Sequence, residues 1–270
     1  MLGLYDSGLG GLTILNELQK LLPNIEICYL ADTKNCPLGE KTNQEILEIT
    51  KNGVEFLFKN GCNLVVLACN TATVIAIREL QNNWLPLYYP DKKILGIVRP
   101  VPELLVEKML QTNINLLLLA TPATVNSGFY KQELKDFNYQ NVTEFSCPGL
   151  AVAIESQNSD LIAQTIAEVF KNNPNNYAKF DIILLACTHY PLATNIIKTI
   201  FIENGGSPEV KIFDQTKLIA GKLLEYLKNH PEVTLNNGKT KIIVTKNKLD
   251  FESKIALIFP KLVVESMLQI

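Results

Sequence analysis

Short, continuously apolar segments recur along this chain and alternate with segments of helical periodicity. These segments are rich in Ile, Val and Leu, and we expect strands in IEICYL (25–30), LVVLA (64–68), ILGIV (94–98), INLLLL (114–119), IILLA (182–186), VKIF (210–213) and KIIV (241–244). A strand that is apolar at consecutive positions is covered on both faces, which is typical of parallel sheets flanked by helices. The alternation therefore predicts an α/β fold with mostly parallel sheets.

Two of the intervening segments show the helical pattern clearly. In LTILNELQKLLP (12–23) the apolar residues fall on one stripe, and Pro23 is expected to stop the helix. In TNQEILEITKNGVEFLFKNG (42–61), Thr42 and Glu45 have the spacing of a capping box at the helix start. We interpret the apolar stripes of both segments as core.

Two apolar segments, one in each half of the chain, end in the same way. NLVVLACNTAT (63–73) and DIILLACTHYP (181–191) both run from an apolar stretch into Ala-Cys and then a polar pair. Ligands of open α/β sheets bind at the carboxyl ends of the strands, where Cys69 and Cys187 both fall. If the chain folds as two similar α/β domains that face each other, the two cysteines meet across a cleft.

A facing pair of thiols can move protons without a metal or an organic cofactor. The pKa of an ordinary thiol is ~8.5, and a helix N-terminus or a neighbouring histidine lowers it. A thiolate and a thiol on opposite sides of a bound carbon acid could take a proton from one face and return one to the other. The carbanion-like transition state needs fixed dipoles and hydrogen-bond donors. CNTAT and CTHYP supply hydroxyls and backbone N–H groups for this purpose.

A single cysteine at a strand end is more often a core residue than a catalyst. The matched pair, with His189 two residues after Cys187, favours the catalytic interpretation, in which His189 tunes a thiol or donates to an anion. The remaining cysteines have no matching context. We interpret them as packing or loop residues: Cys28, Cys36, Cys62 and Cys147.

The segment YDSGLGGLT (5–13) follows a short apolar start and precedes a helix. Its glycines allow a tight turn close to a ligand, and Ser7 adds a hydroxyl. The spacing G-x-G-G differs from the G-x-G-x-x-G of dinucleotide-binding loops, which argues against that function. Three roles stay open for Asp6: accepting a proton, orienting a substrate ammonium group, or capping the next helix.

The composition excludes several classes of partner. The chain of 270 residues is 47% hydrophobic, enough for one large or two smaller cores. Its 25 basic and 27 acidic residues form no block of either sign, so no nucleic-acid or acidic-lipid partner is expected. Only two arginines occur, Arg78 and Arg99. An anionic substrate would therefore be held mostly by backbone N–H groups and hydroxyls.

We expect a cytoplasmic protein without metal or disulfides. The N-terminal MLGLYDSGLGG lacks the features of a secretory signal, and no apolar run approaches the roughly 20 residues of a membrane span. Cytoplasmic thiols stay reduced. There is no C-x-x-C pair, and His189 and His230 are the only histidines, so a structural zinc site has little support.

Taken together, these motifs resemble those of the cofactor-independent glutamate racemases, within the aspartate/glutamate racemase superfamily. The segments that carry the resemblance are DSGLGGLT (6–13), ADTKNCPLGEKT (31–42), LACNTAT (67–73) and LACTHYPL (185–192). Weaker support comes from ATPATVNSGFY (120–130), CPGLAVAIE (147–155) and the terminal IIVTKN. The match extends in order over nearly the whole chain.

The resemblance implies two α/β domains with the active site in the cleft between them. On this basis we place the first domain at 1–97 plus 208–270 and the second at 98–207. It also implies that Cys69 and Cys187 are the catalytic acid/base thiols, one for each enantiomer, assisted by Asp6 and His189. Glu155 matches a further acid near the site. The implied substrate contacts are Asp6, Ser7, Pro37, Leu38, Gly39, Asn70, Thr71, Thr121, Thr124, Glu155, Thr188 and His189.

Two positions depart from the family pattern. Leu38 stands where members usually have tyrosine, which removes a phenol near the substrate. Ala120 stands where they usually have glycine, which adds a methyl group and is tolerated if its φ is negative. These changes bear on the identity of the substrate more than on the type of reaction.

The leading hypothesis is reversible conversion of L-glutamate to D-glutamate, without cofactor, to supply D-glutamate for bacterial peptidoglycan. The alternatives are racemisation of aspartate or another amino acid, a cleft-binding protein without turnover, and a redox or thiol-transfer enzyme. The resemblance also makes a homodimer possible.

Overall fold

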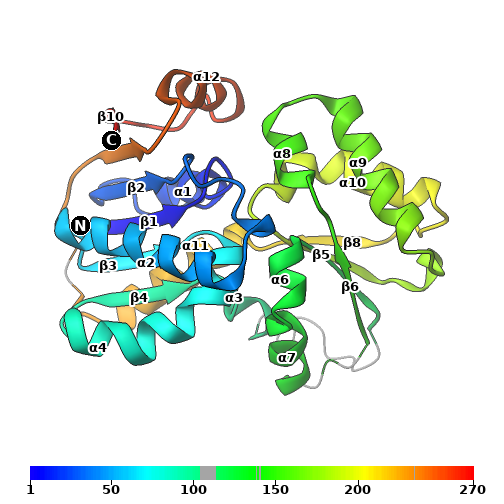
Figure 1. Cartoon of the computed structure of the whole chain (residues 1–270), viewed down its shortest axis with the longest axis horizontal. Coiled ribbons are helices and arrows are strands. Elements are labelled where there is room, and N and C mark those ends of the chain that lie inside the picture. The colour runs from blue at the N-terminus through cyan, green and yellow to red at the C-terminus, as the bar shows by residue number, and fades with distance from the viewer. Residues whose placement is uncertain (104–113, 138, 140, 234) are drawn as a thin grey trace.

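The strands of this protein form two separate parallel sheets, which lie side by side in Figure 1. The computed structural model describes residues 1–103, 114–137, 139, 141–233 and 235–270. All strand pairs within the two sheets are parallel. The predicted α/β fold with mostly parallel sheets is confirmed.

The first sheet has six strands in the order β10-β9-β2-β1-β3-β4. Their bounds are β1 (Leu2–Asp6), β2 (Ile27–Ala31), β3 (Leu64–Leu67), β4 (Lys93–Gly96), β9 (Thr240–Val244) and β10 (Ser266–Gln269). The helices packed around it are α1 (Leu12–Leu21), α2 (Asn43–Lys59), α3 (Asn70–Glu79), the π-helical η2 (Leu80–Trp84), α4 (Leu85–Tyr88), α11 (Thr216–Asn229) and α12 (Lys248–Ile258).

Alternating side chains of these strands build two cores, one on each face. Leu2 and Leu4 of β1 point to the face covered by α1, α11 and α12. Tyr5 of the same strand packs with α2 and α3 on the opposite face. Because both faces are buried, the strands are apolar at consecutive positions, which is the pattern that the sequence displays.

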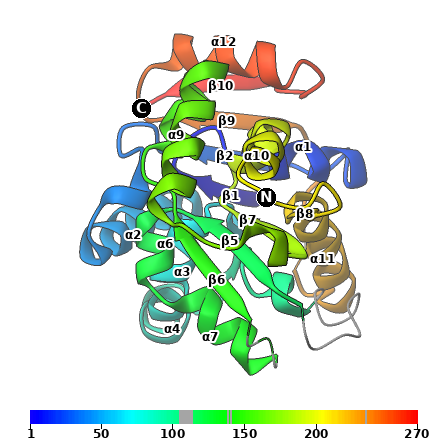
Figure 2. The same ribbon diagram turned by 90° about the vertical axis from the view of Figure 1, so that its right-hand side faces the viewer.

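The second sheet has four strands in the order β6-β5-β7-β8. Their bounds are β5 (Leu116–Ala120), β6 (Val142–Ser146), β7 (Ile182–Ala186) and β8 (Lys211–Asp214). Figure 2 shows α9 (Ser159–Asn172) and α10 (Thr194–Glu203) on one side of this sheet and α6 (Pro122–Asn126) and α7 (Phe129–Asp136) on the other. The remaining elements are α8 (Leu150–Glu155) and the 3-10 helices η1 (Leu38–Glu40), η3 (Tyr177–Lys179) and η4 (Tyr190–Ala193).

The two clearest helix predictions hold, including the expected capping box. Thr42 Oγ1 accepts from the Glu45 N–H at 3.3 Å, and Glu45 Oε2 accepts from the Thr42 N–H at 2.9 Å. Two strands were not among those expected: β6 and β10. Strand β6 reads VTEFS, and β10 is largely exposed at the sheet edge, so neither has a continuous apolar run.

The chain leaves the first sheet after β4 and returns to it after β8. Val98 and Val101 already pack in a core of the second sheet. Strand β8 pairs with β7, with Ile183 opposite Ile212, whereas α11 packs on α1. The expected division near residue 208 assigned β8 to the first domain, because the apolar pattern of VKIF does not tell which sheet the strand joins. The observed pairing puts β8 in the second sheet. We propose 1–97 plus 215–270 for the first domain and 98–214 for the second.

None of the helices that the structure describes is long and apolar enough to cross a membrane.

Candidate active site

The carboxyl ends of strands from both sheets border one cavity. From the first domain it is lined by Ser7, Cys36, Pro37, Leu38, Gly39, Glu40, Cys69, Asn70 and Thr71. From the second domain it is lined by Thr121, Pro122, Cys147, Gly149, Ala151, Val152, Cys187, Thr188 and His189. Neither Arg78 nor Arg99 is among the lining residues.

The two Ala-Cys segments place one thiol from each domain at this cavity. Cys69 follows β3 and occupies the N-cap position of α3, and Cys187 directly follows β7. Each cysteine is only 6% exposed, so each thiol is shielded from bulk water yet borders the cavity. The structure therefore brings together the two cysteines that the sequence paired.

The thiol of Cys69 lies in an environment that favours its protonated form. Burial raises the pKa of Cys69 to about 12, and the nearby carboxylate of Asp6 adds to the shift. The Ser7 hydroxyl lies 3.9 Å from the Cys69 sulfur. This hydroxyl and the Ala72 N–H at the start of α3 both lower the pKa of Cys69 and so partly offset the rise. A positive charge arriving in the cavity would make this thiol more acidic.

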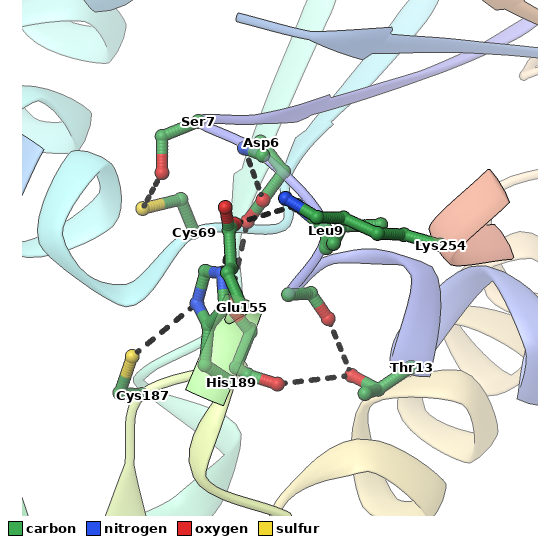
Figure 3. A network of polar contacts seen from close by, with 12 residues as sticks. Asp6, Ser7, Leu9, Thr13, Cys69, Glu155, Cys187, His189 and Lys254 are labelled. Carbon is green, nitrogen blue, oxygen red and sulfur yellow. Dashed lines mark hydrogen bonds and ion pairs between the residues drawn. The ribbon is translucent and has the colours of Figure 1, made fainter. Parts of the chain in front are cut away.

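Cys187 belongs to a chain of polar contacts that runs through His189 to Glu155 (Figure 3). The Cys187 sulfur is 3.8 Å from His189 Nδ1, and His189 Nε2 is 2.7 Å from Glu155 Oε1. Burial alone would lower the pKa of His189, but its contacts with Cys187 and Glu155 outweigh burial and hold this pKa well above its usual range. The contacts with Cys187 and Glu155 therefore favour the charged form of the imidazole.

Asp6 lies at the end of β1 and is completely buried. Its Oδ1 accepts from the Gly8 N–H at 2.8 Å, and its Oδ2 accepts from the Thr188 hydroxyl across the domain boundary at 3.4 Å. Burial raises the pKa of Asp6 to about 6, with the His189 charge acting in the opposite direction. The N-cap position of α1 is Gly11, whose backbone N–H also hydrogen-bonds the Asp6 carboxylate, so Asp6 stabilises the start of that helix in addition to contacting the second domain.

Three threonines from the two domains form one hydroxyl cluster. Thr71 Oγ1 lies 2.9 Å from Thr121 Oγ1 and 3.3 Å from Thr124 Oγ1. Thr121 also caps α6 by accepting from the Thr124 N–H. Hydroxyls at the starts of α3 and α6 suit a carboxylate, since helix N-termini attract anions.

Glycines allow the two domains to touch beside His189. A Cβ on Gly10 would lie 2.4 Å from Thr188 Oγ1 and 2.6 Å from His189 Nδ1. A Cβ on Gly8 would lie 2.7 Å from Glu155 Oε1. The glycine-rich segment therefore serves as a contact surface for the second domain.

Most of the site residues expected from the sequence line the cavity. Asp6, Thr124 and Glu155 do not line it, but each is hydrogen-bonded to a residue that does. Leu38, which stands at the usual tyrosine position, lines it and is 2% exposed. Ala120 is the last residue of β5, in extended backbone.

The interpretation of Cys36 and Cys147 as packing or loop residues was incomplete, because both line the cavity. Cys147 follows β6 as Cys187 follows β7, but VTEFS is too polar to be recognised as a strand. Cys28 and Cys62 lie in the core of the first domain, as expected. None of the six cysteines forms a disulfide, and no group of three metal-ligating side chains gathers among the described residues.

Comparison with known proteins identifies the family. The family model for Asp/Glu/hydantoin racemases matches residues 28–223. The glutamate racemase of Roseobacter denitrificans is 37% identical over 238 residues, which cover 85% of this chain and 86% of that protein. This chain belongs to the Asp/Glu/hydantoin racemase family. The glutamate racemase of Ruegeria pomeroyi is likewise 37% identical, over 86% of both chains.

Solved structures of racemases share the fold of this family member. A glutamate racemase isoform from Bacillus anthracis superposes with a TM-score of 0.84 at 25% identity and covers 98% of this chain and 95% of its own. The Francisella tularensis glutamate racemase in complex with D-glutamate has a TM-score of 0.82 at 24% identity, covering 100% of this chain and 96% of that one. The family resemblance seen in the sequence motifs is thus confirmed.

Proposed function

We propose that this protein is a cofactor-independent glutamate racemase, an isomerase that interconverts L-glutamate and D-glutamate. The observation that carries the proposal is that Cys69 and Cys187, from different domains, border one cavity. Relatives at 37% identity over most of the chain, named glutamate racemases, support glutamate as the substrate.

In the proposed reaction one thiolate removes the Cα proton and the other thiol delivers a proton to the opposite face. The electron pair left at Cα is delocalised into the α-carboxylate until the second proton arrives, so the product is the other enantiomer. In the reverse direction the two thiols exchange roles. Acid and base catalysis by positioned groups of this kind contributes about 10²–10⁴-fold in rate.

The neighbours of each sulfur would tune this exchange. The charged imidazole of His189, held by Glu155, stabilises a thiolate at Cys187. Cys69 has the Ser7 hydroxyl and the N-terminus of α3 instead. Its high pKa in the free protein would fall when a substrate ammonium group enters the cavity.

We propose that hydroxyls and backbone N–H groups hold the two substrate carboxylates. The cavity offers the hydroxyls of Thr71 and Thr121, the amide of Asn70, the Thr188 hydroxyl and the η1 turn at Leu38 and Gly39. Thr124 lies behind the first two hydroxyls and is hydrogen-bonded to both. Neither arginine of the chain lines the cavity. Hydrogen-bond donors at fixed positions around a small cavity favour the binding of a small dicarboxylic acid over a larger anion.

Circular dichroism of the purified protein with each enantiomer of glutamate and aspartate tests the proposal. The assay contains a chelator and no pyridoxal phosphate. We expect the optical signal of both glutamates to decay to zero. Decay with aspartate alone would assign the protein to aspartate racemisation and direct attention to Leu38. An unchanged signal with all four would favour a binding protein without turnover.

The cellular setting is part of the same proposal. We propose a cytoplasmic enzyme whose D-glutamate enters peptidoglycan, because its free thiols need a reducing compartment. Restored growth of a bacterial strain that requires D-glutamate would test this role.

The homodimer expected from the resemblance stays a prediction, which sedimentation velocity would test.

A further inference from the structure

Three buried polar side chains form a closed ring of hydrogen bonds behind Cys69. Asn70 Nδ2 donates to the Tyr130 hydroxyl at 2.5 Å, and the Tyr130 hydroxyl donates to Gln215 Oε1 at 3.3 Å. Gln215 Nε2 donates back to Asn70 Oδ1 at 2.5 Å. Each group donates once and accepts once, and all three residues are at most 1% exposed.

The ring joins three separate parts of the chain. Asn70 is the first residue of α3, directly after Cys69. Tyr130 lies on α7 in the second domain, and Gln215 lies between β8 and α11, where the chain returns to the first domain. The ring therefore closes only when both domains and the return segment hold their present positions.

A buried polar network of this kind is costly unless it is complete. An amide or hydroxyl that is buried away from water without a partner destabilises the fold, so opening one bond of the ring affects all three groups. The ring uses one N–H of the Asn70 amide, which leaves the second N–H for an acceptor in the cavity that Asn70 lines. The orientation of that second N–H depends on the two other members of the ring.

We propose that Tyr130 and Gln215 are positioning residues that fix the Asn70 amide and the start of α3 for binding a substrate carboxylate. They act through Asn70 and do not line the cavity. This inference rests on the proposed function only for the identity of the ligand. The order that the ring imposes on residues 69–73 is a property of the free protein.

Two variants open the ring from different sides: Tyr130→Phe removes the hydroxyl, and Gln215→Met keeps the length of the side chain without its hydrogen bonds. Tyr177→Phe is the matched control. It removes another buried hydroxyl of the second domain, one that contacts the carbonyl oxygens of Phe170 and Asn173 at 2.8 and 2.6 Å. If the two ring variants acted only by destabilising the fold, Tyr177→Phe would change hydrogen exchange and kinetics to the same extent.

Hydrogen exchange of the unliganded proteins, read by mass spectrometry, tests the positioning without any substrate. We expect the backbone amides of residues 69–73 to exchange at least about fivefold faster in Tyr130→Phe and Gln215→Met than in Tyr177→Phe. Equal exchange in the three variants would overturn the inference, whatever the substrate of the protein.

Steady-state kinetics test the link to substrate. We expect both ring variants to raise the KM for L- and D-glutamate roughly 5–20-fold, with kcat within about threefold of wild type. The KM of the double variant should be no more than about twofold higher than the larger KM of the two single variants, since one opened bond already breaks the ring. Faster exchange with an unchanged KM would overturn the link to binding. Absence of glutamate turnover in the wild type would refute the proposed function and leave the exchange result as the test of the ring.

Discussion

Glu155 Oε1 lies 2.7 Å from His189 Nε2, and the other nitrogen of the same ring faces the sulfur of Cys187 at 3.8 Å. Glu155 also accepts from the Leu9 N–H at 3.3 Å, so one carboxylate of the second domain contacts both the imidazole and the glycine-rich segment of the first. The carboxylate of Glu155 favours the charged form of the His189 imidazole, so its replacement should change the protonation of His189.

Glu155→Gln should lower the pKa of His189, because the neutral amide no longer stabilises the imidazolium. NMR of the histidine ring protons measures this pKa, and His189→Asn assigns the signals, since His230 is the only other histidine. We expect kcat/KM to fall about tenfold, the size of a lost charge-assisted hydrogen bond. Glu232→Gln is the control, because Glu232 contacts the exposed His230 at 2.8 Å. An equal loss of activity in the two variants would contradict the proposed role of Glu155.

Cys69→Ser and Cys187→Ser should each reduce racemisation in both directions by about 10²–10⁴-fold, since inversion needs both thiols. In D₂O the remaining thiol can still exchange the Cα proton from its own side. Each variant should therefore incorporate deuterium into one enantiomer without inversion, and the two variants should act on opposite enantiomers. Proton NMR of glutamate measures the exchange. Cys28→Ala, in the core of the first domain, should keep wild-type turnover. Substantial racemisation by both serine variants would exclude the two-thiol reaction.

Asp6→Asn should stabilise the fold at neutral pH while abolishing most activity. The pKa of Asp6 is raised to about 6 by burial, so the folded protein keeps a proton that the unfolded chain loses near pH 4. The stability due to this group is therefore present below about pH 4 and is lost as the pH rises to about 6. We expect the variant to gain about 1–3 kcal/mol at pH 7.5 and nothing at pH 4. Urea unfolding at both pH values checks this, and a variant less stable than wild type at pH 7.5 would show that the Thr188 contact dominates.

Gly10→Ala should impair catalysis by separating the domains, because the new Cβ would lie 2.4 Å from Thr188 Oγ1. Relief of this clash would move the two domains apart, and a misplacement of about 1 Å at the site costs about 10²-fold in kcat/KM. Gly221→Ala is the matched control: its Cβ, on α11, meets nothing within 4 Å. That variant should keep full activity and gain about 0.5–1 kcal/mol from helix propensity. Unimpaired turnover by Gly10→Ala would mean that the domains do not need this close contact during the reaction.

Parts of the site that are encoded locally could be predicted from the sequence. The apolar runs before Cys69 and Cys187 predict strands covered on both faces, and a cysteine at a strand end lies at the edge where such sheets bind ligands. The Thr42 capping box is likewise a matter of spacing within one turn of helix. These features depend on a few consecutive residues, so their physical causes are visible in the sequence.

Other features were decided only by tertiary structure. Strand β8 joins the second sheet by pairing with β7, and nothing in VKIF distinguishes that sheet from the other. Cys147 reaches the cavity because the polar edge strand β6 ends beside β5. The ring of Asn70, Tyr130 and Gln215 joins side chains that are 60 and 85 residues apart. Hydrogen bonds over such separations depend on how two domains pack, whereas the periodicity of a segment reflects only which of its faces is buried.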